Sequence, residues 1–169
     1  PVVSIIGDSE QVHGVVVKQN GQTKAIRAKK GLLLAAGGFS RDAKRRQEHQ
    51  KNPIGSKWTA TNPNDTGGVI TLAENLGVQL EMLGNAWWTP TMTMPSGGVE
   101  AFIVGKSMPG CMVINKAGKR FCNEAEPYED FVKHQYLSND EVPSIPAYLI
   151  FDSRYRKQYP VGTILAPGK

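Results

Sequence analysis

Hydrophobic and polar residues alternate at the start of the chain in a pattern that predicts short strands. β-branched residues dominate residues 2–6 and 12–18, and the turn residues 7–10 separate the two runs. A third run, residues 23–28, follows Asn20-Gly21, the strongest two-residue hairpin signal in the chain. We therefore expect the chain to begin with an antiparallel β-meander.

Residues 31–36 form an apolar run without alternation, which predicts a strand covered on both faces. The run ends in Gly37-Gly38, where the missing side chains let the backbone turn tightly or come close to a ligand. Ligands bind at the carboxyl ends of strands in open α/β sheets. The residues alone leave two interpretations open, a ligand site and a plain turn into a helix.

A short amphipathic helix is predicted after residues 62–68, with Gly77 at its C-terminal cap. Asp65 or Thr66 at its N-cap would precede unpaired N–H groups, which tolerate an anion. As structure alone, such a capped helix needs no ligand. Its apolar face consists of Val69, Leu72, Ala73 and Leu76.

The net charge of +5 indicates an anionic partner only where basic residues cluster. One cluster lies between residues 41 and 51, but it contains Asp42 and Glu48 and no aromatic residue. We interpret it as the solvated face of a short helix and expect no nucleic-acid binding. Its basic members are Arg41, Lys44, Arg45, Arg46, His49 and Lys51.

Two adjacent tryptophans, Trp87 and Trp88, precede Thr89-Pro90 in a stretch predicted to be extended. Neighbours on an extended chain point to opposite faces, so one ring can pack in the core while the other lines a cavity. Packing of both rings is the alternative. Soft side chains nearby suit a flat apolar ligand or core filling equally well. They are Met92, Met94 and Met108.

A β-hairpin is predicted from an apolar run, residues 111–115, a turn at 116–118 and a return segment at 119–123. A helix is then expected over residues 128–136. By periodicity alone, Tyr128 at its start is an ordinary tyrosine at the edge of the core. Further on, residues 145–151 predict a buried strand. Asp152-Ser153 caps a short basic helix that Tyr159-Pro160 ends.

The two cysteines do not make a disulfide framework. A two-residue hairpin loop would place Cys111 opposite Cys122, whereas a three-residue loop would put them out of register. We expect reduced thiols, because cytosolic proteins keep them. A cytoplasmic location is in turn the simplest reading of a chain with no signal-peptide pattern and no bilayer-length apolar run. We expect no metal site. The chain starts at Pro1, and we take it for an internal piece of a longer protein.

The run PGCMVINKAGKRFCNEAEPY, residues 109–128, resembles a Gly-Arg-Arg-Phe-x-Asn-Glu-x-x-x-Tyr segment of the fumarate reductase/succinate dehydrogenase flavoprotein-like superfamily. Within it, the sequence is most similar to the FAD-dependent 3-ketosteroid Δ1-dehydrogenases. Three more stretches resemble that branch in the same order. They are LLLAAGGFSRD, NPNDTGGVITLAENLGV leading to AWWTP, and IPAYLIFDSRYRKQYP.

The resemblance implies a mixed α/β fold, of the α+β kind in its second half. Residues 1–85 would be the rear of an FAD-binding domain, and residues 86–169 the front of a substrate-capping domain. The family's dinucleotide loop, Gly-x-Gly-x-x-Gly, has no counterpart here. We therefore expect the isolated chain to hold no FAD and, with its apolar faces uncovered, to self-associate. The implied FAD contacts are Gly37, Gly38, Thr66, Gly67 and Gly68.

The implied reaction introduces a C=C bond next to the ketone of a 3-ketosteroid-like substrate. Tyr128 would take the proton and FAD the hydride, and a second tyrosine outside this chain would assist. Asn123 and Glu124 are expected to be structural. An apolar substrate would contact Trp87, Trp88 and Pro109, with Trp88 as the wall opposite Tyr128.

Two alternatives remain. One is an ene-reductase of the fumarate reductase type that acts on another enone or unsaturated acid. That branch has His-Pro-Thr and Arg-Gly, where this chain has Trp88-Thr89-Pro90 and Lys106-Ser107. A dianion needs paired cations to offset its desolvation, so the departures favour an apolar substrate. The other alternative is an inactive substrate-gripping or oligomerising module.

Overall fold

The computed structural model describes residues 1–167, and the chain divides into two compact units. The first unit contains residues 1–56 and 61–85, and the second contains residues 57–60 and the chain from Ala86 onward. The main division falls after Asn85. Only the short segment 57–60 departs from that division.

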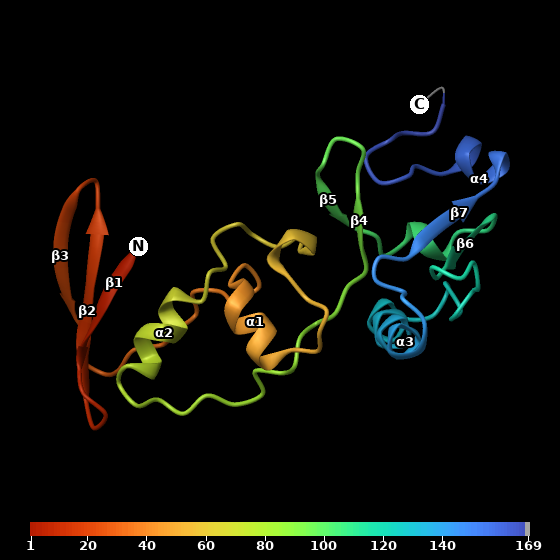
Figure 1. Ribbon diagram of the computed structural model, residues 1–169. Helices are drawn as coiled ribbons and strands as arrows, with labels where there is room; N and C mark the ends of the chain where they lie inside the picture. Colours follow the sequence, from red (N-terminus) through yellow and green to blue (C-terminus); the bar gives the residue numbers. More distant parts are fainter. Residues whose placement is uncertain (168–169) are drawn as a thin grey trace. The chain divides into compact units, whose positions relative to one another are not determined.

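The first unit begins with a three-stranded antiparallel sheet in the order β1-β2-β3, coloured red in Figure 1. Asn20 and Gly21 have φ angles of 51° and 79°, and two positive φ values are what a type I′ hairpin turn requires. The predicted β-meander is thus confirmed. Its strands are β1 (Val2–Gly7), β2 (Val12–Gln19) and β3 (Gln22–Arg27).

The buried strand predicted over residues 31–36 is absent from the described structure, and the prediction is wrong for this chain. Leu33 is 88% exposed and Leu34 is 40% exposed. A strand needs neighbours that pair with its N–H and C=O groups and cover its faces. No described segment of the chain pairs with residues 31–36 in a sheet.

The basic cluster around α1 (Ala43–His49) is not the solvated helix face that the sequence predicts. Arg45 donates two hydrogen bonds to the Glu74 carboxylate, at 2.8 and 2.7 Å, and its own side chain is only 12% exposed. Arg46 donates to the Gly55 carbonyl at 3.0 Å. Arg41 donates to the Thr61 carbonyl. The arginines therefore turn inward onto loop carbonyls, whereas Lys44 stays in solvent.

The second helix of this unit, α2 (Gly68–Glu74), begins differently from the prediction. Its N-cap is Gly67, in the left-handed region at φ 72°, with no side-chain cap from Asp65 or Thr66. Glycine is needed because it adopts this conformation without strain. The C-terminal prediction is confirmed, since Gly77 has a φ of 77° and donates its N–H to the Glu74 carbonyl at 2.9 Å.

Up to residue 167, the second unit contains two small antiparallel sheets and two α-helices. Its core cluster is formed by Val113, Phe131, Val132 and Tyr136. Figure 1 shows the elements from green to blue. They are β4 (Thr91–Thr93), β5 (Val99–Ala101), η2 (Gly105–Ser107), β6 (Cys111–Ile114), α3 (Tyr128–Glu141), β7 (Tyr148–Phe151) and α4 (Ser153–Gln158). A short 3-10 turn, η1 (Ser56–Trp58), lies at the edge of segment 57–60.

The predicted hairpin forms its turn but not its second strand. Asn115 donates its N–H to the Lys119 carbonyl at 2.9 Å, and one bridge joins Ile114 to Arg120. The return strand then stops because the Val113 N–H is already bonded to the Glu124 carboxylate at 2.8 Å. Instead, β6 pairs with β7 along its whole length. The turn holds three residues, 116–118, and Cys111 and Cys122 are free cysteines in the structure.

Helix α3 begins at Tyr128, as predicted, but runs to Glu141, beyond the expected end at residue 136. Its last turns are polar, so apolar periodicity does not reveal them. The strand predicted over residues 145–151 is shorter and is not buried, because β7 lies in a two-stranded sheet and Ile150 is 48% exposed. The cap of α4 is confirmed, since Asp152 accepts the Tyr155 N–H at 2.8 Å.

Candidate functional site

Backbone hydrogen bonds bring two glycine loops of the first unit together. The Gly67 N–H donates to the Gly38 carbonyl at 3.0 Å, and the Arg41 N–H donates to the Asp65 carbonyl at 2.9 Å. The loops at 37–41 and 65–68, distant in sequence, therefore lie side by side. Their contact brings together all the residues implied as FAD contacts, which are Gly37, Gly38, Thr66, Gly67 and Gly68.

The glycines in these loops fall into two kinds. Gly37 has a φ of 81°, and a Cβ atom there would lie 2.5 Å from Asp65 Oδ1. A Cβ atom at the buried Gly67 would lie 2.9 Å from Phe39 Cβ. The positive φ at Gly37 and the crowding at Gly67 therefore favour glycine at both positions. Gly38 and Gly68 are different, because no heavy atom lies within 4 Å of an added Cβ. They leave an open, exposed face of backbone.

Tyr128 is the first residue of α3, in the second unit, and is half-buried. The helix starts here because Pro127 precedes it as N-cap and accepts the Phe131 N–H at 3.0 Å. Tyr136, two turns further on, contacts Trp88 edge to face, with ring centroids 5.6 Å apart. At 1.5 Å per residue, that contact is about 12 Å along the helix from Tyr128.

The two tryptophans point to different environments, which is one of the two arrangements considered for them. Trp88 is half-buried and packs against the core cluster, where it contacts Tyr136 rather than Tyr128. Trp87 is 80% exposed, and Pro109 is also exposed, so both are accessible to a ligand.

Glu124 holds the segment that leads into α3, the structural role expected of it. The residue is only 4% exposed. Its carboxylate accepts the Val113 N–H at 2.8 Å and two donors of Arg120, Nε at 3.0 Å and Nη2. Burial alone would raise the pKa of Glu124, but the hydrogen bonds from Arg120 and Val113 outweigh it and hold the pKa below its usual value.

Lys106 is a buried residue that sequence reasoning did not single out. It is 1% exposed, and its Nζ donates to the carbonyls of Glu124, at 2.7 Å, and Glu126, at 2.6 Å. Burial lowers the pKa of Lys106, while Glu126, Cys122 and Glu124 act against that shift. Lysine is almost always exposed, so nothing in its sequence context signals this position.

The cysteines of the second unit are not reactive groups. Burial, reinforced by Glu126 and Glu124, raises the pKa of Cys122 to about 12. Burial also raises the pKa of Cys111, whose Sγ lies 3.2 Å from the Met108 carbonyl. Both thiols therefore remain protonated at neutral pH and do not act as nucleophiles.

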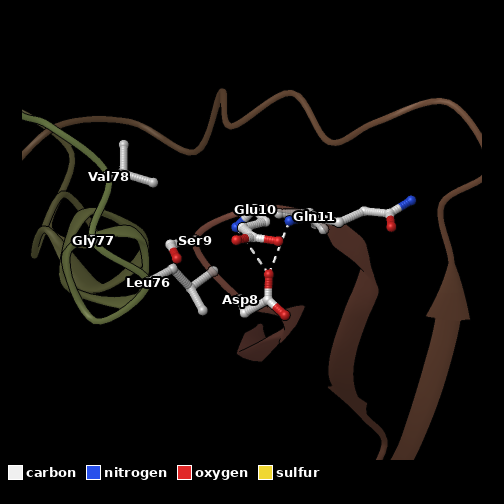
Figure 2. Close-up of a pocket in the computed structure, with 8 residues that line it drawn as sticks. Asp8, Ser9, Glu10, Gln11, Leu76, Gly77 and Val78 are labelled. Atoms are coloured by element: carbon white, nitrogen blue, oxygen red, sulfur yellow. Dashed lines mark hydrogen bonds between the residues drawn. The ribbon is translucent and has the colours of Figure 1, made fainter.

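A small pocket lies in the first unit between the β1–β2 turn and the end of α2, and Figure 2 shows its lining. The Asp8 carboxylate in its lining accepts the N–H groups of Glu10 and Gln11, both at 2.9 Å. These bonds close the turn, and none of the sequence-predicted site residues lines the pocket. It is a feature of the fold rather than a candidate site.

Comparison with known proteins identifies the family to which the chain belongs. The family model described as an FAD binding domain matches residues 1–161. The chain belongs to this family of FAD binding domains.

Within residues 1–167, no cluster of His, Cys, Asp or Glu is arranged to hold a metal ion. None of the described helices combines the length and the apolar character needed to cross a bilayer.

This chain of the FAD binding domain family is similar to steroid dehydrogenases. The 3-oxosteroid 1-dehydrogenase of Mycobacterium tuberculosis is 37% identical over 94% of the chain. The crystal structure of 3-ketosteroid delta1-dehydrogenase from Sterolibacterium denitrificans, in complex with 1,4-androstadiene-3,17-dione, matches 98% of the chain with a TM-score of 0.90 and 37% identity. The chain spans 30% of the length of each.

A more distant relative belongs to the other branch considered. The fumarate reductase (cytochrome) of Shewanella frigidimarina is 30% identical over 89% of the chain, which spans 25% of that protein. The resemblance to the 3-ketosteroid dehydrogenases and the mixed α/β fold are thus confirmed. FAD is the cofactor of the family, and the open backbone at Gly38 and Gly68 fits the close approach of a flat group.

We predict that Glu124→Gln destabilises the full-length protein at neutral pH by about 1.5–3 kcal/mol, the usual cost of losing a hydrogen bond to a charged group. Because the pKa of Glu124 is lowered on folding, its contribution is present above the unfolded value of about 4.3 and is lost as the pH falls through the lower folded value. Urea unfolding at several pH values measures the difference between wild type and variant.

That difference is expected to shrink below about pH 4 as Glu124 becomes protonated. Glu141→Gln, at an exposed position of α3, is the matched control and should change stability by less than about 0.5 kcal/mol. A gap between wild type and Glu124→Gln that stays constant down to low pH would contradict the assignment.

Proposed function

We propose that the protein containing this chain is an FAD-dependent dehydrogenase that introduces a C=C bond next to the ketone of a 3-ketosteroid-like substrate. The observation that carries this proposal is the match, with a TM-score of 0.90, to a 3-ketosteroid delta1-dehydrogenase over 98% of the chain. The chain spans about a third of such a protein, so the activity, substrate and partners of the whole belong to the proposal.

The two glycine loops form part of the flavin site in this proposal. Bound FAD would supply the hydride acceptor. The residues of this chain provide backbone that a flat ring can approach, at Gly38 and Gly68, held in place by the Gly67 to Gly38 hydrogen bond. Asp65 has a structural part, since its carboxylate lies against Gly37 and its carbonyl accepts the Arg41 N–H.

Tyr128 takes the proton from the carbon next to the ketone. It stands at the N-terminus of the fourteen-residue helix α3, where the aligned peptide dipoles favour negative charge. Two acidic residues of the first turn, Glu129 and Asp130, oppose that effect. Lys133 offsets them, because its Nζ lies 3.2 Å from the Glu129 carboxylate and 3.6 Å from that of Asp130. The first turn therefore keeps an environment suited to a proton-accepting oxygen.

The substrate is apolar rather than a dicarboxylate. A dianion would need free cations, but Lys106, which lies where the fumarate reductase branch has its Arg-Gly, is 1% exposed and donates to backbone carbonyls. Trp87 and Pro109 are exposed and offer apolar contact instead. These contacts favour the steroid-like substrate over the ene-reductase alternative, although a fumarate reductase is among the relatives.

Self-association and a cytoplasmic location belong to the proposal as well. Large apolar side chains are exposed in both units, among them Leu33 at 88%, Met82 at 73% and Trp87 at 80%. Exposed apolar surface of this kind favours association of the isolated chain. In a larger protein, the same surface would pack against the remaining parts of the chain. The module alternative, with no activity of its own, rests on this exposure alone.

We predict that Gly38→Ala leaves folding nearly unchanged but weakens FAD binding in the full-length protein by about tenfold or more. The reason is that the new methyl group meets no protein atom within 4 Å and extends into the space assigned to the flavin. Gly37→Ala is the matched comparison, because its strained φ and its contact with Asp65 should cost about 1–3 kcal/mol of stability. Thermal unfolding and titration of apoprotein with FAD separate the two effects. Unchanged FAD affinity in Gly38→Ala would contradict the placement.

We predict that Tyr128→Phe lowers the rate of 3-ketosteroid dehydrogenation at least about a hundredfold, because the proton acceptor is lost, with little change in folding. Steady-state turnover and thermal unfolding of the full-length protein measure both. Tyr148→Phe, at a half-exposed position of β7, is the control and should keep its turnover. If Tyr128→Phe retains near-wild-type turnover, Tyr128 is not the base.

A further inference from the structure

We propose that Lys106 is a positioning residue for Tyr128, holding the backbone before it and the Phe131 ring after it so that the phenol keeps one place relative to the substrate. This inference rests on the proposed function, in which Tyr128 is the base. It starts from the contacts of the buried Lys106 ammonium with the residues around Tyr128.

The first contact fixes the segment that leads into α3. The Lys106 Nζ donates to the carbonyls of Glu124 and Glu126, which flank Ala125. Ser107 Oγ donates to the same Glu124 carbonyl at 3.0 Å. Residues 124–126 have no regular secondary structure, so these bonds replace the ladder that a strand would have supplied. The last held carbonyl lies two residues before Tyr128.

The second contact lies on the other side of Tyr128. The Lys106 Nζ is 5.2 Å from the centroid of the Phe131 ring, within the range of a cation–π interaction. Phe131 is 3% exposed and lies in the first turn of α3, three residues after Tyr128. One ammonium group thus contacts the chain before and after the proposed base, and it ties both to η2.

A neutral donor is sufficient to hold a loop carbonyl in place, and the Ser107 hydroxyl already does this at the Glu124 carbonyl. A buried ammonium costs far more desolvation than a hydroxyl. Glu124 and Glu126 reduce that cost, because both attract the Lys106 charge. What the ammonium adds is several directed contacts from one rigidly enclosed atom. A base that must meet a C–H bond in one orientation depends on such placement, since a misplacement of about 1 Å can cost about a hundredfold in rate.

The test uses Lys106→Met in the full-length flavoprotein, assayed with a 3-ketosteroid. Methionine keeps the apolar stem and removes all three donors. We expect kcat to fall about tenfold or more while KM changes less than about threefold and the FAD content stays the same. Lys157→Met, an exposed lysine of α4, is the control with unchanged kcat.

A double-variant cycle separates positioning from a merely structural role. If Lys106 acts through Tyr128, adding Lys106→Met to Tyr128→Phe lowers kcat no further than Tyr128→Phe alone. A lowered melting temperature with unchanged kcat, or losses that multiply in the double variant, would overturn the inference. Near-wild-type turnover of Tyr128→Phe would overturn the proposed function instead, so the two failures are distinguishable.

Ser107→Ala keeps the inference testable if Lys106→Met fails to fold. Ser107 is exposed, so its loss should not unfold the protein, yet it removes one hydrogen bond from the same Glu124 carbonyl. We expect kcat to fall about twofold to fivefold, and that loss to vanish in the Tyr128→Phe background. An unchanged kcat in Ser107→Ala, or a loss that persists without Tyr128, would count against positioning through this segment.

Discussion

A buried carboxylate organises the second unit. Glu124 accepts the Val113 N–H of β6 and the guanidinium of Arg120, while its own carbonyl accepts hydrogen bonds from Lys106 and Ser107. A buried charge of this kind is tolerated only when it is paired and hydrogen-bonded, and Arg120 provides the opposite charge. The edge of β6, the hairpin turn and the start of α3 all depend on it. The position of Tyr128 is a consequence of this junction.

The first unit depends on backbone contact rather than on a buried charge. The Gly67 N–H donates to the Gly38 carbonyl, and the positive φ angles of Gly37 and Gly67 disfavour any side chain. The ion pair of Arg45 with Glu74 then fixes α1 against α2. This arrangement presents the backbone of Gly38 and Gly68 on an open face. An open backbone face of this kind allows a flat cofactor to approach closely.

Local signals in the sequence predict local structure well in this chain. Asn20-Gly21 predicts a hairpin turn, Gly77 the end of α2, Asp152 the cap of α4 and Tyr128 the start of α3, because each acts within a few residues. Failures occur where a distant partner decides. Residues 31–36 find no pairing strand among the described residues. The return strand after the hairpin turn loses the Val113 N–H to a side chain eleven residues away.

The candidate site shows the same limit. The glycine pair and the Tyr128 motif are recognisable because a family resemblance supplies their roles, but the contact between the two glycine loops is long-range and no spacing predicts it. Hydrophobic pattern also cannot tell which of Trp87 and Trp88 packs in the core, since both are apolar. The burial of Lys106 cannot be predicted for the opposite reason, because a charged lysine after a glycine is expected to lie on the surface.

The central claim is that the full-length protein passes a hydride from a 3-ketosteroid to FAD. Anaerobic mixing of the oxidised flavoprotein with 4-androstene-3,17-dione, followed by absorbance, tests it most directly. We expect the steroid to bleach the visible flavin band within a single turnover, and fumarate added afterwards not to restore the band. A band that the steroid leaves unchanged, in a protein whose chemically reduced flavin is reoxidised by fumarate, would contradict the account and favour the ene-reductase.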